Sequence, residues 1–174
     1  NYPTAELFIN GKSYGKQSKN NSSLKSRYRL MWMDAVYEPG EVKVVAYNKD
    51  GKAVAEKTVR TAGKPHHIEL VSNRNELTAD GKDLAYVTVK VVDKDGNLCP
   101  TDSRLIHFSV KGAGKFRAVA NGDPTNLEQF HLPKMHAFHG MLTAIVQAGE
   151  IAGDLVLTAK ASGVKTGTVH LQAK

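Results

Sequence analysis

The chain has 174 residues, with 24 basic and 17 acidic side chains, one cysteine and 41% hydrophobic residues. This length suits one large domain or two small ones and is too short for a (β/α)₈ barrel, which needs roughly 200–250 residues. No stretch approaches the ~18–20 apolar residues of a membrane span, the single cysteine excludes an internal disulfide, and the first ten residues lack a signal-peptide layout.

The excess of basic residues lies mostly in the first third of the chain. Residues 1–62 carry 11 basic and 6 acidic side chains, and much of this excess falls in residues 16–29. A basic loop is one mark of nucleic-acid binding, but only Tyr28 and Trp32 lie nearby and no recognition helix follows. We interpret the segment as a solvated loop that favours solubility, and we expect no nucleic-acid partner.

Short strands separated by turns are predicted throughout the first 62 residues. Asn10-Gly11 is a strong hairpin signal, because both residue types tolerate positive φ. Strands are predicted where apolar and polar residues alternate, at Ala5–Ile9, from near Ser13, and at Tyr28–Ala35, Glu41–Tyr47 and Ala53–Thr61. This spacing is typical of a β-sandwich.

The only tryptophan, Trp32, lies in the strand predicted at 28–35 and alternates with Tyr28 and Leu30. An exposed tryptophan offers a flat surface on which a sugar ring stacks, whereas a buried one fills a sandwich core. The alternation favours the core position for Trp32.

The bent, apolar-poor link at residues 62–65 indicates a domain boundary, so domains are expected at residues 1–62 and 63–174. Only residues 127–139 have room for a helical turn, which Pro133 interrupts. Seven strands over ~110 residues fit an immunoglobulin-like sandwich, and they are predicted at Ile68–Ser72, Leu84–Asp93, Leu105–Gly112, Lys115–Ala120, Gly140–Gln147, Gly153–Ala161 and Thr166–Ala173.

Two pairs of carboxylates are the nearest candidates for glycosidase chemistry, which needs two carboxyl groups ~5–9 Å apart, one of them with a raised pKa. These are Asp80 with Asp83, and Asp93 with Asp95. Both pairs lie in turn sequences, where aspartate is favoured because it accepts hydrogen bonds from the local backbone. We therefore interpret them as turn residues, and the second pair also lacks the glycine and glutamate positions of an EF-hand.

Three histidines, His131, His136 and His139, suggest a metal site by their proximity in the sequence. Their spacing matches no common ligand pattern, and no cysteine or carboxylate cluster accompanies them. Cys99 has no recognisable nucleophile context. We expect no metal, no cofactor and no catalytic residue in this chain.

Two stretches of the first unit, ELFINGKSYGK (6–16) and YRLMWMDAVYEPGEVKVVAYNKDGK (28–52), resemble the small Ig-like domain that follows the catalytic barrel in bacterial glycoside hydrolase family 2 enzymes. In the second unit, residues 76–97 and ANGDPTNLEQFHLPKMHAFHGMLTAIVQ (120–147) are similar to the C-terminal Ig-like domain of the same β-galactosidase group. The expected fold is all-β, with two immunoglobulin-like β-sandwich domains in tandem, the first truncated at its N-terminus.

The resemblance implies a non-catalytic C-terminal accessory region of a β-galactosidase, a retaining glycosidase whose catalytic glutamates belong to the absent barrel. The implied partners are the remainder of the parent glycosidase and an oligosaccharide, and the implied location is periplasmic or secreted. The chain departs from the family pattern at Cys99, His136 and His139. An adhesin-like Ig interaction module of a cell surface is the alternative function.

The residues we expect to contact carbohydrate are Asn121, Asp123, Phe130 and His136. Asparagine and aspartate bind sugar hydroxyls, and Phe130 offers a stacking face on a loop held by a rigid scaffold. In the alternative interpretation, Asn121 and Asp123 cap a tight turn while Phe130 and Phe138 pin the long loop to the sandwich.

Overall fold

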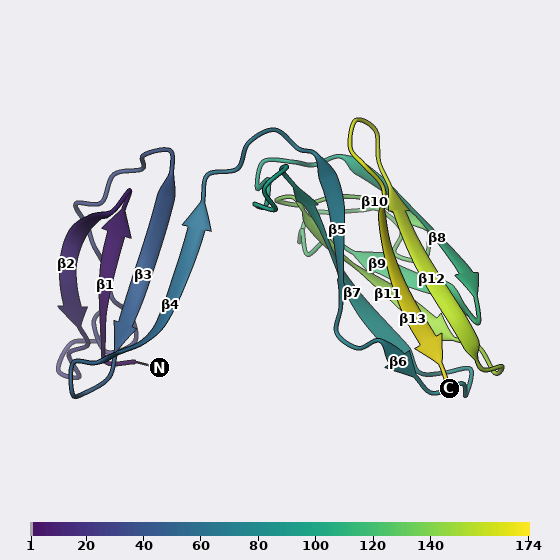
Figure 1. Cartoon of the computed structure of the whole chain (residues 1–174), viewed down its shortest axis with the longest axis horizontal. Coiled ribbons are helices and arrows are strands. Elements are labelled where there is room, and N and C mark those ends of the chain that lie inside the picture. The colour runs from purple at the N-terminus through teal and green to yellow at the C-terminus, as the bar shows by residue number, and fades with distance from the viewer. Residues whose placement is uncertain (1) are drawn as a thin grey trace. The chain divides into compact units, whose positions relative to one another are not determined.

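The structure, a computed structural model, describes residues 2–174 and contains thirteen strands and no helix within them (Figure 1). The predicted all-β fold class is confirmed. The chain forms two compact units, residues 1–61 and residues 62–174, here called unit 1 and unit 2. The described residues include no helix of the length and hydrophobicity that crossing a bilayer requires.

Unit 1 holds one antiparallel sheet in the order β2-β1-β3-β4 (Figure 1). Asn10 and Gly11 have φ values of +48° and +81°, so they form the predicted hairpin turn between β1 and β2. Alternation along β1 buries Ala5, Leu7 and Ile9 on one face of the sheet. The strands are β1 (Thr4–Ile9), β2 (Lys12–Ser18), β3 (Glu41–Tyr47) and β4 (Ala53–Arg60).

The strand predicted at Tyr28–Ala35 is wrong, because these residues lie in turns and irregular backbone. The core position predicted for Trp32 is also wrong: its side chain is only partly buried, and its indole N–H donates to the carbonyl oxygen of Gly15 at 2.8 Å. Alternation of side chains was not sufficient evidence for a strand, because the backbone N–H and C=O groups of a strand also need a neighbouring strand to bond to. No strand of the unit 1 sheet pairs with this segment. The basic stretch from residue 16 is likewise not all loop, because its first three residues belong to β2.

Unit 2 is built from two sheets, one in the order β10-β8-β12-β13-β6 and the other in the order β5-β7-β11-β9. All seven predicted strands are present, each within one residue at either end. The two strands that were missed, β6 and β10, are too short to show an alternating pattern, and β10 lies where a helical turn was expected. The strands are β5 (His67–Ser72), β6 (Glu76–Leu77), β7 (Leu84–Val92), β8 (Leu105–Gly112), β9 (Gly114–Ala120), β10 (Lys134–His136), β11 (Met141–Ala148), β12 (Gly153–Lys160) and β13 (Gly167–Ala173).

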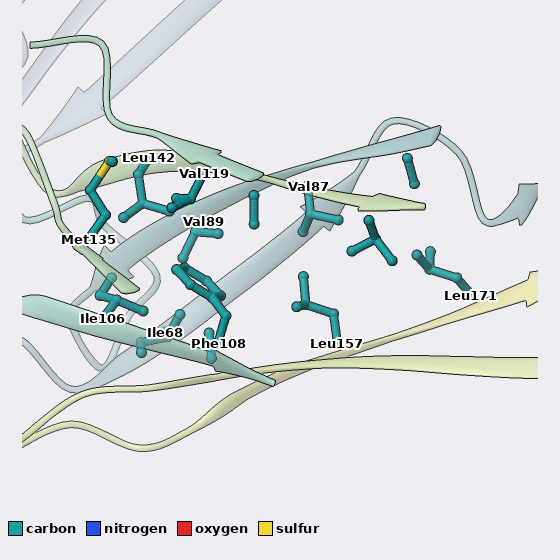
Figure 2. Close-up of a cluster of buried hydrophobic side chains, with 14 of the residues drawn as sticks. Ile68, Val87, Val89, Ile106, Phe108, Val119, Met135, Leu142, Leu157 and Leu171 are labelled. Atoms are coloured by element: carbon teal, nitrogen blue, oxygen red, sulfur yellow. The ribbon is translucent and has the colours of Figure 1, made fainter. Parts of the chain in front are cut away.

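The core of unit 2 lies between its two sheets (Figure 2) and is filled mainly by alternate residues of β5, β7, β8, β11, β12 and β13. Val87 and Val89 from one sheet meet Phe108 and Leu157 from the other. Burying each such side chain contributes roughly 1.5–3 kcal/mol. Met135 of β10 is fully buried and anchors the long connection between β9 and β11 to this core.

Candidate functional site

The long connection between β9 and β11 carries all four residues expected to contact carbohydrate. It begins with two successive turns that are closed by side chains. The backbone N–H of Asp123 donates to Asn121 Oδ1 at 3.1 Å, and the backbone N–H and hydroxyl of Thr125 both donate to Asp123 Oδ1 at 2.8 Å. This is the local chemistry for which asparagine and aspartate are favoured in turns.

The entrance and exit of the loop are joined by hydrogen bonds. Asn121 Nδ2 donates to the carbonyl oxygen of His136 at 3.0 Å. Glu128 accepts from the backbone N–H of His136 and lies 3.1 Å from its Nδ1, which makes His136 part of the loop scaffold. Asn121 therefore both caps the first turn and fastens the loop to β10.

An open hollow of about 440 Å³ lies where this loop meets the start of β11. That volume lies within the range of small-molecule sites, ~300–1,000 Å³. Asn121 contributes a polar edge, and Phe138 and Met141 contribute apolar surface. The full lining is Ala120, Asn121, Gly122, Phe138, Met141, Leu142 and Thr143.

A tight turn positions Phe138 at the hollow. Phe138 and Met141 exchange two backbone hydrogen bonds, of 2.9 and 3.0 Å. Gly140 in this turn has φ of +74°, and a Cβ there would lie 2.3 Å from the carbonyl oxygen of Cys99, so only glycine fits. The Phe138 ring also packs against the ring of His139, with their centroids 4.2 Å apart.

Phe130 lies elsewhere on the loop. Its side chain is 57% exposed, and it does not line the hollow. Its backbone carbonyl accepts a hydrogen bond of 2.8 Å from Val119, so Phe130 contributes to loop closure through its main chain. The structure thus brings Asn121 together with the half-buried Phe138 at the hollow, where the turn that Gly140 permits holds Phe138 in place.

Hydrogen bonds hold the pKa of the Asp123 carboxyl below its ordinary value. The largest cause is the backbone N–H of Thr125, followed by the Thr125 hydroxyl, with a smaller electrostatic contribution from His139. Hydrogen bonds to the charged form favour ionisation. Asp123 is therefore an ionised acceptor suited to bind hydroxyl groups and unsuited to donate a proton.

The three histidines of this region do not assemble into a metal site. His136 faces Glu128, and His139 Nδ1 lies 3.2 Å from the carbonyl oxygen of Pro100. Across residues 2–174 the structure contains no group of three or more histidine, cysteine or acidic side chains placed to hold a metal ion.

The first candidate acid pair, Asp80 and Asp83, lies in a turn, and both carboxyl groups have lowered pKa values. Asp80 accepts from the backbone N–H groups of Lys82 and Asp83, and these bonds lower its pKa. Asp83 accepts from Thr78 and pairs with Arg74, and its pKa is lowered too. A glycosidase acid needs the opposite shift.

Asp93 is buried, and its pKa lies far below the ordinary range. The backbone N–H of Gly63 is the largest cause, and Asn97 and Asp95 donate further hydrogen bonds. Asp95 is exposed on the same turn. Asp93 therefore fastens the beginning of unit 2 to the turn after β7, and its lowered pKa makes it unsuited to donate a proton.

Cys99 is buried in the core of unit 2. Burial raises the pKa of its thiol, and nearby Asp93 and Asp102 raise it further. A buried thiol with a raised pKa is a poor nucleophile.

Fold and site together define an immunoglobulin-like sandwich module that presents a hydrogen-bonded loop and a hollow. Residues 68–170 match the model described as glycoside hydrolase family 2 C-terminal domain 5, and residues 1–55 match a model described as a domain of unknown function, DUF4982. The first match alone covers more than half of the chain. The chain therefore belongs to glycoside hydrolase family 2, as its C-terminal region, and the predicted resemblance is confirmed.

Similar proteins are found over nearly the whole chain. The β-galactosidase BoGH2A of Bacteroides ovatus is 43% identical over 169 residues, which is 97% of this chain and 19% of that protein. A glycosyl hydrolase family 2 member from Bacteroides cellulosilyticus has a TM-score of 0.85 at 32% identity, covering 99% of this chain and 22% of that one. A β-glycosidase from Bacteroides vulgatus has a TM-score of 0.88 at 27% identity, covering 99% and 21%. The chain spans about a fifth of the length of these relatives.

Proposed function

We propose that this chain is the non-catalytic C-terminal accessory region of a β-galactosidase that acts in the periplasm or outside the cell. The observation that carries the proposal is the extent of the match: 97% of the chain aligns with only 19% of the β-galactosidase of Bacteroides ovatus. The remaining length of such a protein has ample room for a (β/α)₈ barrel of about 250 residues. The family match supports this function over that of a cell-surface adhesin module.

The lowered pKa values of carboxyl groups in this chain support the assignment of glycoside hydrolysis to another part of the parent enzyme. Its shifted carboxyl pKa values lie below the ordinary range at Glu6, Asp80, Asp83, Asp93, Asp102 and Asp123. A retaining glycosidase needs a carboxyl group that stays protonated near neutral pH. The catalytic acid and nucleophile are therefore assigned to the barrel, against which this region packs.

The loop between β9 and β11 is proposed to assist carbohydrate binding beside that barrel. Asn121 and Asp123 present amide and carboxylate groups, and Phe138 presents an aromatic face at the hollow. Phe130 and His136 lie exposed on the same loop. Because a rigid sandwich holds the loop, such contacts orient an extended sugar without changing the chemical step.

A hydrolysis assay tests the non-catalytic assignment. The purified 174-residue chain should release no nitrophenol from nitrophenyl β-D-galactoside, whereas the full-length polypeptide that carries it should. Activity of the chain that survives repurification would overturn the assignment.

Calorimetric titration of the chain with lactose and longer β-galactosides tests the sugar contact. Phe138→Ala should weaken binding more than Phe130→Ala, because only the Phe138 ring lines the hollow. Asn121→Ala should weaken it as well. If no sugar gives heat with the unmodified chain, the loop has only a structural role.

A further inference from the structure

One face of the sheet β10-β8-β12-β13-β6 points away from the core of unit 2. Along β8, Ile106 and Phe108 are buried in the core, whereas His107 and Ser109 are exposed on the opposite face. The other strands of this sheet alternate in the same way between buried and more exposed residues. The register of the strand pairs therefore determines which exposed side chains are neighbours on this face.

A row of basic side chains crosses the exposed face of this sheet. His107 on β8 is paired with Lys134 of β10 on one side and with Lys160 of β12 on the other, and all three are exposed. Because neighbouring strands lie about 4.8 Å apart, the backbones of the two lysines are about 10 Å apart, with an imidazole between them. Lys111, four residues further along β8, adds a third exposed lysine about 13 Å from His107. These four residues are here called the basic face.

Within residues 2–174, no described ion pair includes a lysine of the basic face. Glu128, which contacts β10, is bonded to His136, and Glu76, on the edge strand β6, pairs with Lys174. Asp154 lies near the start of β12, six residues and about 20 Å from the basic row. A patch with one sign of charge attracts ligands of the opposite charge and raises their local concentration.

A row of hydroxyl groups lies beside the basic row. Thr158 of β12 is paired with Ser109 of β8 on one side and with Thr168 of β13 on the other. Each hydroxyl both donates and accepts hydrogen bonds. The surface therefore combines ammonium groups, which bind carboxylates through charge-assisted hydrogen bonds, with groups that bind the hydroxyls of a sugar.

The basic face lacks the apolar anchors by which other macromolecules bind. Among residues 2–174, none of the large apolar side chains that are exposed belongs to β8, β10, β12 or β13. Protein interfaces have aromatic and other apolar side chains at their centre, single-stranded nucleic acids stack on aromatic rings, and membrane-surface segments insert apolar groups. An extended polymer that is both anionic and rich in hydroxyls needs none of these.

We propose that the basic face binds an acidic polysaccharide that carries carboxylate groups, a polymer of uronic acid. Its carboxylates contact Lys134, Lys160 and Lys111, and its hydroxyls contact the row at Thr158. The lysines are spaced about 10–13 Å apart, which suits a polymer with one charge on each sugar better than a densely sulfated one. The proposal goes beyond the proposed function and does not rest on it, because the basic face shares no residue with the lining of the hollow.

Isothermal titration of the 174-residue chain with polygalacturonate tests the proposal, and uncharged dextran is the neutral control. Polygalacturonate should give heat of binding and dextran should give none. At about 0.15 M salt, exposed charges further apart than about 8 Å are largely screened, so basic residues elsewhere in the chain contribute little. No heat with polygalacturonate would overturn the proposal, and so would equal binding of dextran. The hydrolysis assay with nitrophenyl β-D-galactoside is independent of this outcome.

Two double variants that remove the same charge localise the binding. Lys134→Gln with Lys160→Gln removes two charge-assisted contacts and should weaken the binding of polygalacturonate at least roughly tenfold. Lys94→Gln with Lys115→Gln removes two exposed lysines of unit 2 outside the basic face and should change the affinity less than about threefold. Lys134→Arg with Lys160→Arg keeps both charges and should keep the affinity. Unchanged urea unfolding verifies that the variants fold.

The variants also separate the proposal from its alternatives. Equal losses of affinity in the two glutamine double variants would show attraction by net charge alone and would overturn the proposal. Dextran sulfate, single-stranded DNA and vesicles of phosphatidylcholine with phosphatidylserine are titrated in the same way. Tighter binding of any of these than of polygalacturonate, with the same loss in Lys134→Gln with Lys160→Gln, would assign the basic face to that class of partner and overturn the proposal.

Discussion

Unit 1 and unit 2 are both built from strands in which apolar and polar residues alternate, but the two units differ in what covers the apolar faces of these strands. In unit 2 the inward residues of one sheet meet those of a second sheet, and residues from Ile68 to Ala173 form one buried cluster. In unit 1 the buried apolar residues are Ala5, Leu7 and Ile9. Alternation of apolar and polar residues thus gives a strand one apolar and one polar face. The stability of the strand depends on a second layer that buries the apolar face.

The two long loops of the molecule show the same difference. In unit 2 the loop at 121–139 is held by the buried Met135 and by the bond from Asn121 to His136. In unit 1 the loop at 19–40 is attached by the indole N–H of Trp32 and by Asn10, which bonds to residues 39 and 41. A loop anchored through polar contacts at the surface has less to stabilise it than one anchored in a core.

The largest expected effect comes from Met135→Ala in unit 2. Removing this fully buried side chain leaves a cavity and should lower the free energy of unfolding of unit 2 by about 2–5 kcal/mol. Urea unfolding followed by circular dichroism measures the change. Trp32, the only tryptophan, reports on unit 1, so its fluorescence midpoint should not move. A shift of both signals together would show that the units unfold as one.

Asp93→Asn should have the next largest effect and should depend on pH. The folded pKa of Asp93 lies below its unfolded value of about 3.9, so its contribution to stability is present above that pH and is lost as the pH falls. The unmodified unit 2 should therefore lose stability between pH 5 and pH 3. The variant should be less stable at pH 7 and should lose less over this interval, while Asp95→Asn, an exposed neighbour, is the matched control. Identical pH profiles for the variant and the unmodified chain would contradict this role.

Asn121→Ala should have a smaller effect on unit 2. It removes the cap on Asp123 and the bond to His136, and a net loss of about 1 kcal/mol is expected. Asn121→Asp keeps the acceptor for the turn but loses the donor to His136, so it separates the two contributions. Urea midpoints measure stability, and faster amide exchange across residues 121–136 localises the change. A lower midpoint with no faster exchange in that loop would place the effect elsewhere.

The strands of unit 2 could be located from the sequence. Their inward residues pack against a second sheet, and both sheets belong to this chain. It could not show that residues 28–35 pair with no strand among residues 2–174, since alternation describes side chains and says nothing of what the backbone bonds to. The turns at Asn121 and Asp123 could be predicted because they depend on neighbours two residues away. The position of Phe138 at the hollow, in place of Phe130, depends on the turn at Gly140 and on its close approach to the distant Cys99, which the local sequence does not reveal.

The smallest expected effect is that of Met33→Ala in unit 1, the same substitution that should be severe at Met135. Met33 is 86% exposed, so its removal leaves no cavity and should change the free energy of unfolding by less than about 0.5 kcal/mol. The Trp32 fluorescence midpoint in urea measures this change in unit 1. If Met33→Ala destabilised the isolated chain as strongly as Met135→Ala, unit 1 would have a core of its own, and the contrast between the units would fail.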